Sequence, residues 1–193
     1  MKLGVVLLAA GRSERFGSNK LLADLHGRPL ICRALEAARA VPAENACVVT
    51  GSEEIAALAC AYGWNVIANP DAHLGQAHSI HLGASAMQTM DAVLLMVGDQ
   101  PRLTGGSLMR LVTDFQASGK GIACLRDETH IGNPAVFAKG YFSELLALAG
   151  DRGAKGILRA HESDLLVVPC LQPGELADTD TPQALESIRQ QLR

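Results

Sequence analysis

The sequence predicts a single-domain α/β protein whose mostly parallel central sheet is covered by helices on both faces. Short apolar runs alternate with segments of helical periodicity, an order typical of parallel strands joined by crossover helices. The chain has 193 residues, 48% of them hydrophobic, which is enough for one domain with a substantial core. No long linker, internal repeat or low-complexity tract divides it. We therefore expect residues 1–193 to form one unit.

The individual elements follow from these runs. Strands are predicted at 3–8, 46–50, 65–68, 92–97, 121–125, 135–137 and 165–169. Helices are predicted at 29–40, 53–62, 77–90, 106–117, 141–148, 154–161 and 182–191. Pro29 and Pro182 suit the first turn of a helix, where a missing N–H costs little. Thr181 is the expected N-cap of the last helix.

Composition and charge exclude several classes of function. The net charge is -3 and aromatic residues make up 4% of the chain, so no surface for nucleic acid is expected. No apolar run approaches the roughly 18 residues of a membrane-spanning helix. A signal peptide would need a cleavage site that destroys the loop after the first strand. We expect a cytoplasmic protein with no nucleic-acid partner and no membrane partner.

The cysteines and histidines predict neither a disulfide framework nor a zinc site. No Cys-x-x-Cys motif occurs, and the thiols are expected to be buried and reduced in apolar segments. His78 and His81 would share one helix face, but no third ligand accompanies them. The five cysteines are Cys32, Cys47, Cys60, Cys124 and Cys170.

The segment 8–20, Leu-Ala-Ala-Gly-Arg-Ser-Glu-Arg-Phe-Gly-Ser-Asn-Lys, directly follows the first predicted strand. Glycines let a loop approach a ligand closely, and successive backbone N–H groups form a concavity for anions. Arg15 and Lys20 add positive charge. The spacing between Gly11 and Gly17 excludes a Walker A loop, and the dinucleotide fingerprint is absent here. The segment therefore predicts a polyphosphate-binding loop of another kind.

A carboxylate is expected beside this loop. Asp99 ends the apolar run 92–97, and ligands of open parallel sheets collect beyond the carboxyl ends of the strands. An aspartate beside a triphosphate suits Mg²⁺, which prefers oxygen ligands and shares substrate phosphates. As Gly-Asp-x-Pro is also turn chemistry, a plain turn at Asp99 is the alternative interpretation.

The segment 8–20 resembles the nucleotidyltransferase signature Leu-Ala-Ala/Gly-Gly-x-x-x-Arg-x-Gly-x-x-Lys, and is most similar to that of the molybdenum cofactor cytidylyltransferases. Residues 98–101 and 178–182 resemble the family's Gly-Asp-x-Pro and Asp-x-Asp-Thr-Pro stretches. The resemblance covers nearly the whole chain. It implies a Rossmann-like nucleotidyltransferase fold of the GT-A type, with a nucleotide-binding part at about 1–105 and an acceptor-binding part at about 106–193.

The resemblance also implies roles for single residues. Arg15, Lys20 and Asp99 would be catalytic. Asp99 and Asp180 would hold Mg²⁺, for which Mn²⁺ can substitute, with Asp178 as the alternative to Asp180. Acidic residues here would equally suit capping of the last helix. The residues implied to contact the nucleotide are Leu8, Ala9, Ala10, Gly11, Arg12, Ser13, Arg15, Lys20, Gly75, Ser79 and Asp99.

For Gly75 and Ser79, which match a family Gly-x-x-x-Ser segment, an ordinary helix start is the alternative. The acceptor side is implied by a Gly-x-Pro segment and by residues 150–155, which match Gly-Asp-x-Gly-Ala-Arg/Lys. Asn133 departs from the histidine common there, and exposed loop charge is the alternative for Arg152. The implied acceptor-binding residues are Gly132, Asn133, Pro134, Asp151, Gly153 and Lys155.

The resemblance implies transfer of a cytidylyl group from CTP to the terminal phosphate of a molybdopterin-type cofactor, with release of pyrophosphate. The implied client of the product is a molybdoenzyme of the xanthine dehydrogenase type. The methyl group of Ala10 favours the smaller pyrimidine, because the guanylyl branch resembles Leu-Ala-Gly-Gly instead. Two alternatives stay open. One is a nucleotidyltransferase that uses GTP or a sugar or polyol phosphate; the other is a non-catalytic carrier that holds the cofactor for insertion.

Overall fold

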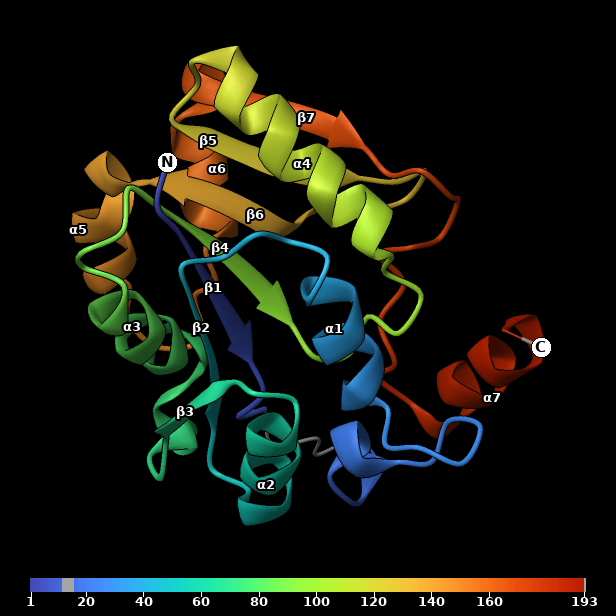
Figure 1. Ribbon diagram of the computed structural model, residues 1–193. Helices are drawn as coiled ribbons and strands as arrows, with labels where there is room; N and C mark the ends of the chain where they lie inside the picture. The colour runs from blue at the N-terminus through green and yellow to red at the C-terminus, as the bar shows by residue number, and fades with distance from the viewer. Residues whose placement is uncertain (12–15, 193) are drawn as a thin grey trace.

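A computed structural model describes residues 1–11 and 16–192. It contains one seven-stranded sheet of order β3-β2-β1-β4-β6-β5-β7, shown in Figure 1. β6 runs antiparallel to β4 and β5, and every other pair is parallel. The predicted single-domain α/β class with a mostly parallel sheet is confirmed. The strands are β1 (Leu3–Leu8), β2 (Asn45–Thr50), β3 (Asn65–Ala68), β4 (Ala92–Val97), β5 (Ile122–Arg126), β6 (Ile131–Ala138) and β7 (Leu165–Pro169).

All predicted helices are present. They are α1 (Ile31–Ala38), α2 (Glu53–Ala61), α3 (Gln76–Ala86), α4 (Gly105–Ser118), α5 (Phe142–Leu146), α6 (Lys155–Ala160) and α7 (Pro182–Gln191). Short 3₁₀ turns are η2 (Lys20–Leu22), η3 (Ala72–Leu74), η4 (Lys139–Tyr141) and η5 (Glu162–Asp164).

Several predicted boundaries differ from the structure. The strand predicted at 135–137 is longer, because pairing with both β4 and β5 continues it through Ile131–Ala138. The placement of Pro29 in a first helical turn is wrong: Pro29 forms a bridge with Asp24, and α1 begins two residues later. Thr181 caps α7 as predicted, accepting a hydrogen bond of 3.1 Å from the N–H of Ala184.

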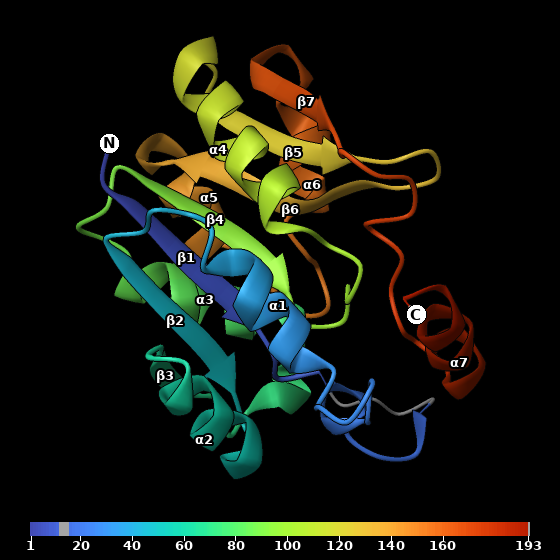
Figure 2. The ribbon, with the colours of Figure 1, turned by 45° about the vertical axis from the view of Figure 1, so that its right-hand side comes forward.

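Two hydrophobic cores cover the two faces of the sheet. Because side chains alternate along a strand, Leu3, Val5 and Leu7 of β1 pack with the core of α1, α2 and α4, whereas Val6 and Leu8 pack with that of α3, α5 and α6. Figure 2 shows α1 and α4 in front of the sheet and α3 behind it. This double cover explains why the central strands β1 and β4 carry no polar side chain.

The strand order reverses at β1. The chain runs from β1 to β2 and β3 on one side and then crosses by α3 to β4 on the other. Right-handed crossovers put α1 and α2 on one face and α3 on the opposite face. The loops after β1 and β4 therefore diverge, and the crevice between them is where a ligand binds in an open sheet.

The thiol prediction is partly wrong. All five cysteines are free, but Cys60 lies on an exposed face of α2 and Cys170, just after the end of β7, is only half-buried. Within the described ranges, no helix is both long and apolar enough to cross a membrane.

Candidate active site

The first cavity lies at the carboxyl ends of β1 and β4 and has a volume of about 460 Å³. η3 and the start of α3 close one side of it with Ala72, His73 and Gln76, which the sequence did not single out. Its wall contains several residues predicted to bind the nucleotide: Leu8, Ala10, Gly11, Lys20, Gly75, Ser79 and Asp99.

Ala9, also predicted to contact the nucleotide, is hydrogen-bonded to the neighbouring strand β2. Its N–H donates to the carbonyl of Val49 over 2.8 Å, and its carbonyl accepts from the hydroxyl of Thr50 over 3.1 Å. Ala9 is 3% exposed and does not line the cavity. Its contacts extend the pairing of β1 with β2 by one residue, so that Ala10 and Gly11 come next in the chain and line the cavity. Arg12, Ser13 and Arg15 lie outside the described residues.

Ser79 is placed by α3 on the cavity wall and is 6% exposed. Its Oγ accepts a hydrogen bond of 2.9 Å from Nδ2 of Asn69, a fully buried side chain whose Oδ1 accepts from the N–H of Asp71. Asn69 therefore fixes the Ser79 oxygen and leaves the hydroxyl hydrogen as the donor that Ser79 can offer to a ligand.

Lys20 lies at the centre of the site, between two carboxylates. Its Nζ donates to Oδ2 of Asp99 over 2.6 Å and to Oδ1 of Asp180 over 2.7 Å. The lysine side chain is only 13% exposed. Burial alone would lower its pKa, but the charge of Asp99 and the hydrogen bonds to Asp180 and Asp99 together raise the pKa of Lys20 above its ordinary value. Lys20 is therefore a fixed positive charge.

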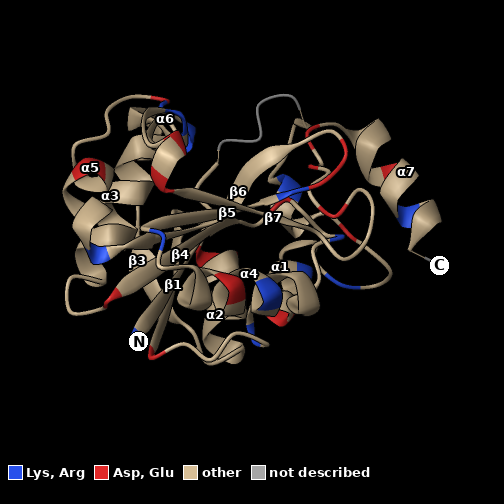
Figure 3. Cartoon of the chain, turned by 90° about the horizontal axis from the view of Figure 1, so that it is seen from above, with Lys and Arg blue, Asp and Glu red and all other residues tan. Residues whose placement is uncertain are grey.

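Local sequence explains how Lys20 reaches this place. Asn19 caps η2, since its Oδ1 accepts from the N–H of Leu21 over 3.2 Å. Leu21 is buried against Gly98, where an added Cβ would lie only 3.3 Å from its methyl groups. The glycine before Asp99 therefore lets the loop after β4 approach η2 closely. Figure 3 shows basic and acidic residues together in the loops between the sheet and α7.

A second cavity of about 370 Å³ adjoins the first, and the two share Leu8, Gln76, Val97, Asp99 and Asp151. Its wall is formed by β6, the start of α6 and the segment before α7. Of the residues predicted to bind the acceptor, this wall contains all except Pro134, namely Gly132, Asn133, Asp151, Gly153 and Lys155. Arg152, for which exposed loop charge was the alternative, is not in the wall either.

Two glycines join the two cavities. Gly75 has φ +92° and ψ 178°, a conformation open mainly to glycine, and an added Cβ would lie 2.5 Å from the carbonyl oxygen of Gly150. At Gly153, a Cβ would lie 2.6 Å from Oε1 of Gln76. The N–H of Ala77 also donates to Gly150 over 3.1 Å. The start of α3 is thus packed directly on the acceptor loop.

Residues 170–181 form a segment, here called the strap, that carries Asp178 and Asp180 to the site. Glu175, 1% exposed, accepts hydrogen bonds of 2.8–2.9 Å from Thr104, Ser107 and Gln172. These donors include the N-cap of α4, where a negative charge is favourable. The buried carboxylate therefore anchors the strap to α4.

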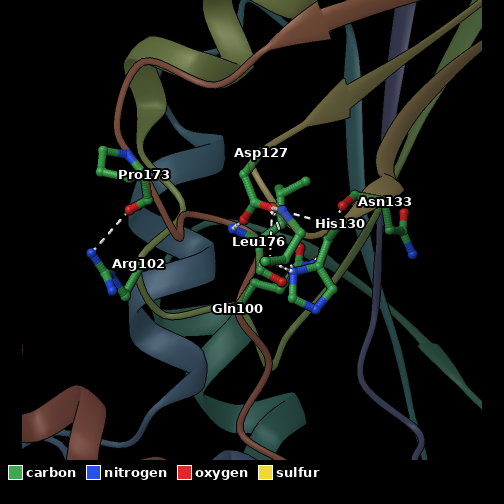
Figure 4. A network of polar contacts seen from close by, with 8 residues as sticks. Gln100, Arg102, Asp127, His130, Asn133, Pro173 and Leu176 are labelled. Atoms are coloured by element: carbon green, nitrogen blue, oxygen red, sulfur yellow. Dashed lines mark hydrogen bonds and ion pairs between the residues drawn. The ribbon is translucent and has the colours of Figure 1, made fainter.

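Further contacts hold the strap from the other side, as Figure 4 shows. The N–H of Leu176 donates to Asp127 over 3.1 Å, and its carbonyl accepts from Nε2 of Gln100 over 3.2 Å. Backbone hydrogen bonds from Thr129, His130 and Leu176 outweigh the effect of burial and lower the pKa of Asp127. Nε2 of Gln100 also donates to the carbonyl of Asn133 over 3.3 Å. The strap is therefore tied to the loop after β4 and to the turn between β5 and β6.

Thr179 completes this anchorage. It is fully buried, and both its N–H (3.1 Å) and its hydroxyl (3.0 Å) donate to the carbonyl of Asp99. The residues on either side consequently diverge: Asp180 lines the first cavity and Asp178 the second. None of these strap contacts was predicted. The Asp-Thr-Asp spacing is the only signal in the sequence, and it does not reveal that the threonine binds Asp99.

The carboxylates of Asp99 and Asp180 fit a divalent ion. They are hard oxygen donors that already hold a cation, the ammonium of Lys20, between them. Among the residues that the structure describes, no group of three or more His, Cys, Asp or Glu side chains could hold a metal. In this part of the chain, the carboxylates of Asp99 and Asp180 are the pair that meets at one cation. Loss of hydration, and then repulsion from Asp180 and Asp99, raises the pKa of Asp178.

A cavity at the carboxyl ends of the strands, a lysine between two carboxylates and an adjoining second cavity suit a nucleotidyltransferase. Comparison with known proteins narrows the class. Residues 5–165 match the MobA-like NTP transferase domain, and the chain belongs to this family.

Individual proteins of similar sequence agree with this family. The chain is 29% identical to the purine catabolism protein PucB of Bacillus subtilis, covering 97% of this chain and 96% of PucB. It is 28% identical to a probable molybdenum cofactor guanylyltransferase of Pyrococcus horikoshii, over 81% of this chain and 78% of that protein.

A solved structure confirms the fold. Rv0371c of Mycobacterium tuberculosis superposes with a TM-score of 0.82 at 26% identity, over 98% of this chain and 97% of that one. A structure of Rv0371c in complex with manganese superposes with a TM-score of 0.77 at 23% identity, over 98% and 99% of the two chains.

Proposed function

We propose that this protein transfers a cytidylyl group from CTP to the terminal phosphate of a molybdopterin-type cofactor and releases pyrophosphate. The observation that carries the proposal is the pair of joined cavities that meet at Asp99. The first is lined by Ala10, Gly11 and Lys20 of the predicted phosphate loop and the second by residues predicted to bind the acceptor, so two substrates would meet where the carboxylates and Lys20 lie. The guanylyltransferase relative supports the cofactor as acceptor.

The residues of the chain would act mainly by position and charge. The backbone of Ala10 and Gly11 would receive the triphosphate, and Lys20 would neutralise negative charge that develops as pyrophosphate leaves. Lys155, whose stem packs against Gly132, would hold the anionic acceptor. A phosphate nucleophile is already ionised at neutral pH, so the step requires no general base.

Asp99 and Asp180 would hold Mg²⁺, or Mn²⁺ in its place, and the bound ion would supply charge neutralisation at the phosphates. The manganese complex of Rv0371c supports a divalent ion in this fold. Asp178, on the acceptor side of Thr179, would face the cofactor and not the ion.

Cytidine is proposed because Ala10, which carries a methyl group where the guanylyl branch has glycine, lines the first cavity. We place the reaction in the cytoplasm, with an enzyme of the xanthine dehydrogenase type as the client. The relative named for purine catabolism supports such a client.

The test is a matrix of CTP, GTP, ATP and UTP against the molybdopterin-type cofactor and a sugar 1-phosphate, scored by pyrophosphate release with Mg²⁺ or Mn²⁺. We expect release with CTP and the pterin cofactor. Release only with GTP would reject the base assignment, and release only with the sugar phosphate would reject the acceptor. Cofactor binding with no release under any condition would make the protein a carrier.

A further inference from the structure

The ammonium of Lys20 occupies the place between the two carboxylates that the proposed metal would need. It lies 2.6 Å from Asp99 and 2.7 Å from Asp180, both hydrogen-bonding distances. The three side chains together carry a net charge of -1, whereas the two carboxylates without the lysine would carry -2. Much of the negative charge that would attract a divalent ion is therefore already neutralised.

The backbone that carries the two carboxylates is held in place beside Lys20. Thr179 ties the strap to the main-chain carbonyl of Asp99 with two hydrogen bonds, so the backbones of Asp99 and Asp180 are held side by side. Lys20 is held on η2 by the Asn19 cap and by Leu21, which is 4% exposed. Of the three side chains, that of lysine is the longest and can move its charge furthest from the cluster.

A divalent ion and an ammonium cannot share these oxygens at low cost. Like charges about 4 Å apart repel strongly where water is partly excluded. A nucleoside triphosphate in the first cavity would change this balance, because its phosphate oxygens would accept the Lys20 ammonium in place of the carboxylates. The carboxylates would then be released to a metal ion.

We propose that Lys20 is an internal cation that weakens metal binding to the nucleotide-free site, so that metal and nucleotide bind with positive coupling. This inference rests on the proposed function, since it assumes that a metal-dependent nucleotide site is present. By linkage, the nucleotide strengthens metal binding by the same factor as the metal strengthens nucleotide binding. The nucleotide-free enzyme would therefore bind little free Mg²⁺ or Mn²⁺.

The experiment is a titration of the nucleotide-free protein with Mn²⁺, with free Mn²⁺ measured by electron paramagnetic resonance. Lys20→Met should bind Mn²⁺ at least about tenfold more tightly than wild type, which corresponds to about 1.4 kcal/mol. Lys20→Gln keeps an N–H donor for the carboxylates and should shift in the same direction even where the methionine variant folds poorly. Lys20→Arg keeps the charge and should resemble wild type.

Two controls locate the effect. Lys120→Met removes an equal charge from an exposed lysine bound to the carbonyl of Ser163, and should leave Mn²⁺ affinity unchanged. Asp180→Asn added to Lys20→Met should abolish the gain. Circular dichroism confirms that each variant is folded. If folded Lys20→Met and Lys20→Gln both bind Mn²⁺ no more tightly than wild type, the inference is overturned.

Failure of this inference can be told apart from failure of the proposed function. Pyrophosphate release by wild type without a gain of Mn²⁺ affinity in the variants would reject the role of Lys20 as an internal cation and leave the proposed transfer reaction standing. A gain of Mn²⁺ affinity without pyrophosphate release under any substrate combination would reject the transfer reaction and leave the competition between lysine and metal standing.

Discussion

The nucleotide cavity and the acceptor cavity are walled by different kinds of structure. The first lies where parallel strands β1 and β4 end, and Ala10, Gly11 and Asp99 follow those strands by two or three positions, although Asp180 reaches it from the strap. The second depends on antiparallel β6, the start of α6 and the strap, which meet only in the folded chain. The comparison teaches that the first wall is built mostly from loops next to strand ends, whereas the second depends more on contacts between segments far apart in the sequence.

The largest expected effect is at the point that both cavities share. Asp99→Asn is nearly isosteric but removes a charged ligand, so turnover should fall at least about 100-fold, as when one strong electrostatic element is lost. The fold should persist, measured as an unchanged circular dichroism spectrum. The matched control is Asp91→Asn at the opposite end of β4, where the carboxylate accepts a hydrogen bond from the N–H of Lys2. Wild-type turnover of Asp99→Asn at low Mg²⁺ would remove Asp99 from the metal site.

Gly75→Ala tests whether the two cavities are structurally separate. Gly75 belongs to the nucleotide wall, yet an added Cβ would clash with Gly150 and Asp151 of the acceptor loop, at 2.5 and 2.6 Å. The backbone strain alone should cost about 1–3 kcal/mol. The KM for the acceptor should therefore rise at least about tenfold, equivalent to about 1.4 kcal/mol.

The control for this prediction is Gly63→Ala, which has a similar φ of +79° but open space around the position. It should share the loss of stability and leave the KM for the acceptor unchanged. Equal KM values for Gly75→Ala and wild type would show that the acceptor loop does not depend on the start of α3.

The same contrast separates what the sequence could predict from what it could not. Strands and helices were predictable because their apolar periodicity is local, and Lys20 and Asp99 because each belongs to a short motif that follows a strand. The roles of Glu175 and Thr179 were not, since each acts through partners about 70–80 residues away. Asn69 was likewise invisible as the partner of Ser79, because a buried amide next to proline has the same local pattern as an ordinary loop.

Ala10→Gly tests only which residue sets the choice of nucleotide base in the first cavity. Loss of one methyl from the loop should let a purine fit better, and one methylene-sized group is worth about 1–3 kcal/mol in pocket discrimination. We expect the ratio of kcat/KM for CTP to that for GTP to fall by about fivefold, the low end of this range, with no reversal, because Ser79 and the rest of the wall remain. An unchanged ratio would show that Ala10 does not set base choice.

Thr179→Val should have the smallest effect. It removes the hydroxyl hydrogen bond to the carbonyl of Asp99 but keeps the shape and the N–H bond, so stability should fall by about 1 kcal/mol in urea unfolding. Thr113→Val on an exposed face of α4 is the control and should change stability little. A loss no larger than in this control would mean that the hydroxyl does not anchor the strap.

The most direct test of the division between the cavities compares Lys20→Ala with Lys155→Ala. Each lysine lines one cavity only, the first and the second respectively. For Lys20→Ala we predict a fall in kcat of at least about tenfold with nearly unchanged affinity for the molybdopterin-type cofactor; for Lys155→Ala we predict a similar rise in the KM for the cofactor with an unchanged KM for CTP. Collapse of cofactor binding in Lys20→Ala while CTP turnover persists would contradict the account.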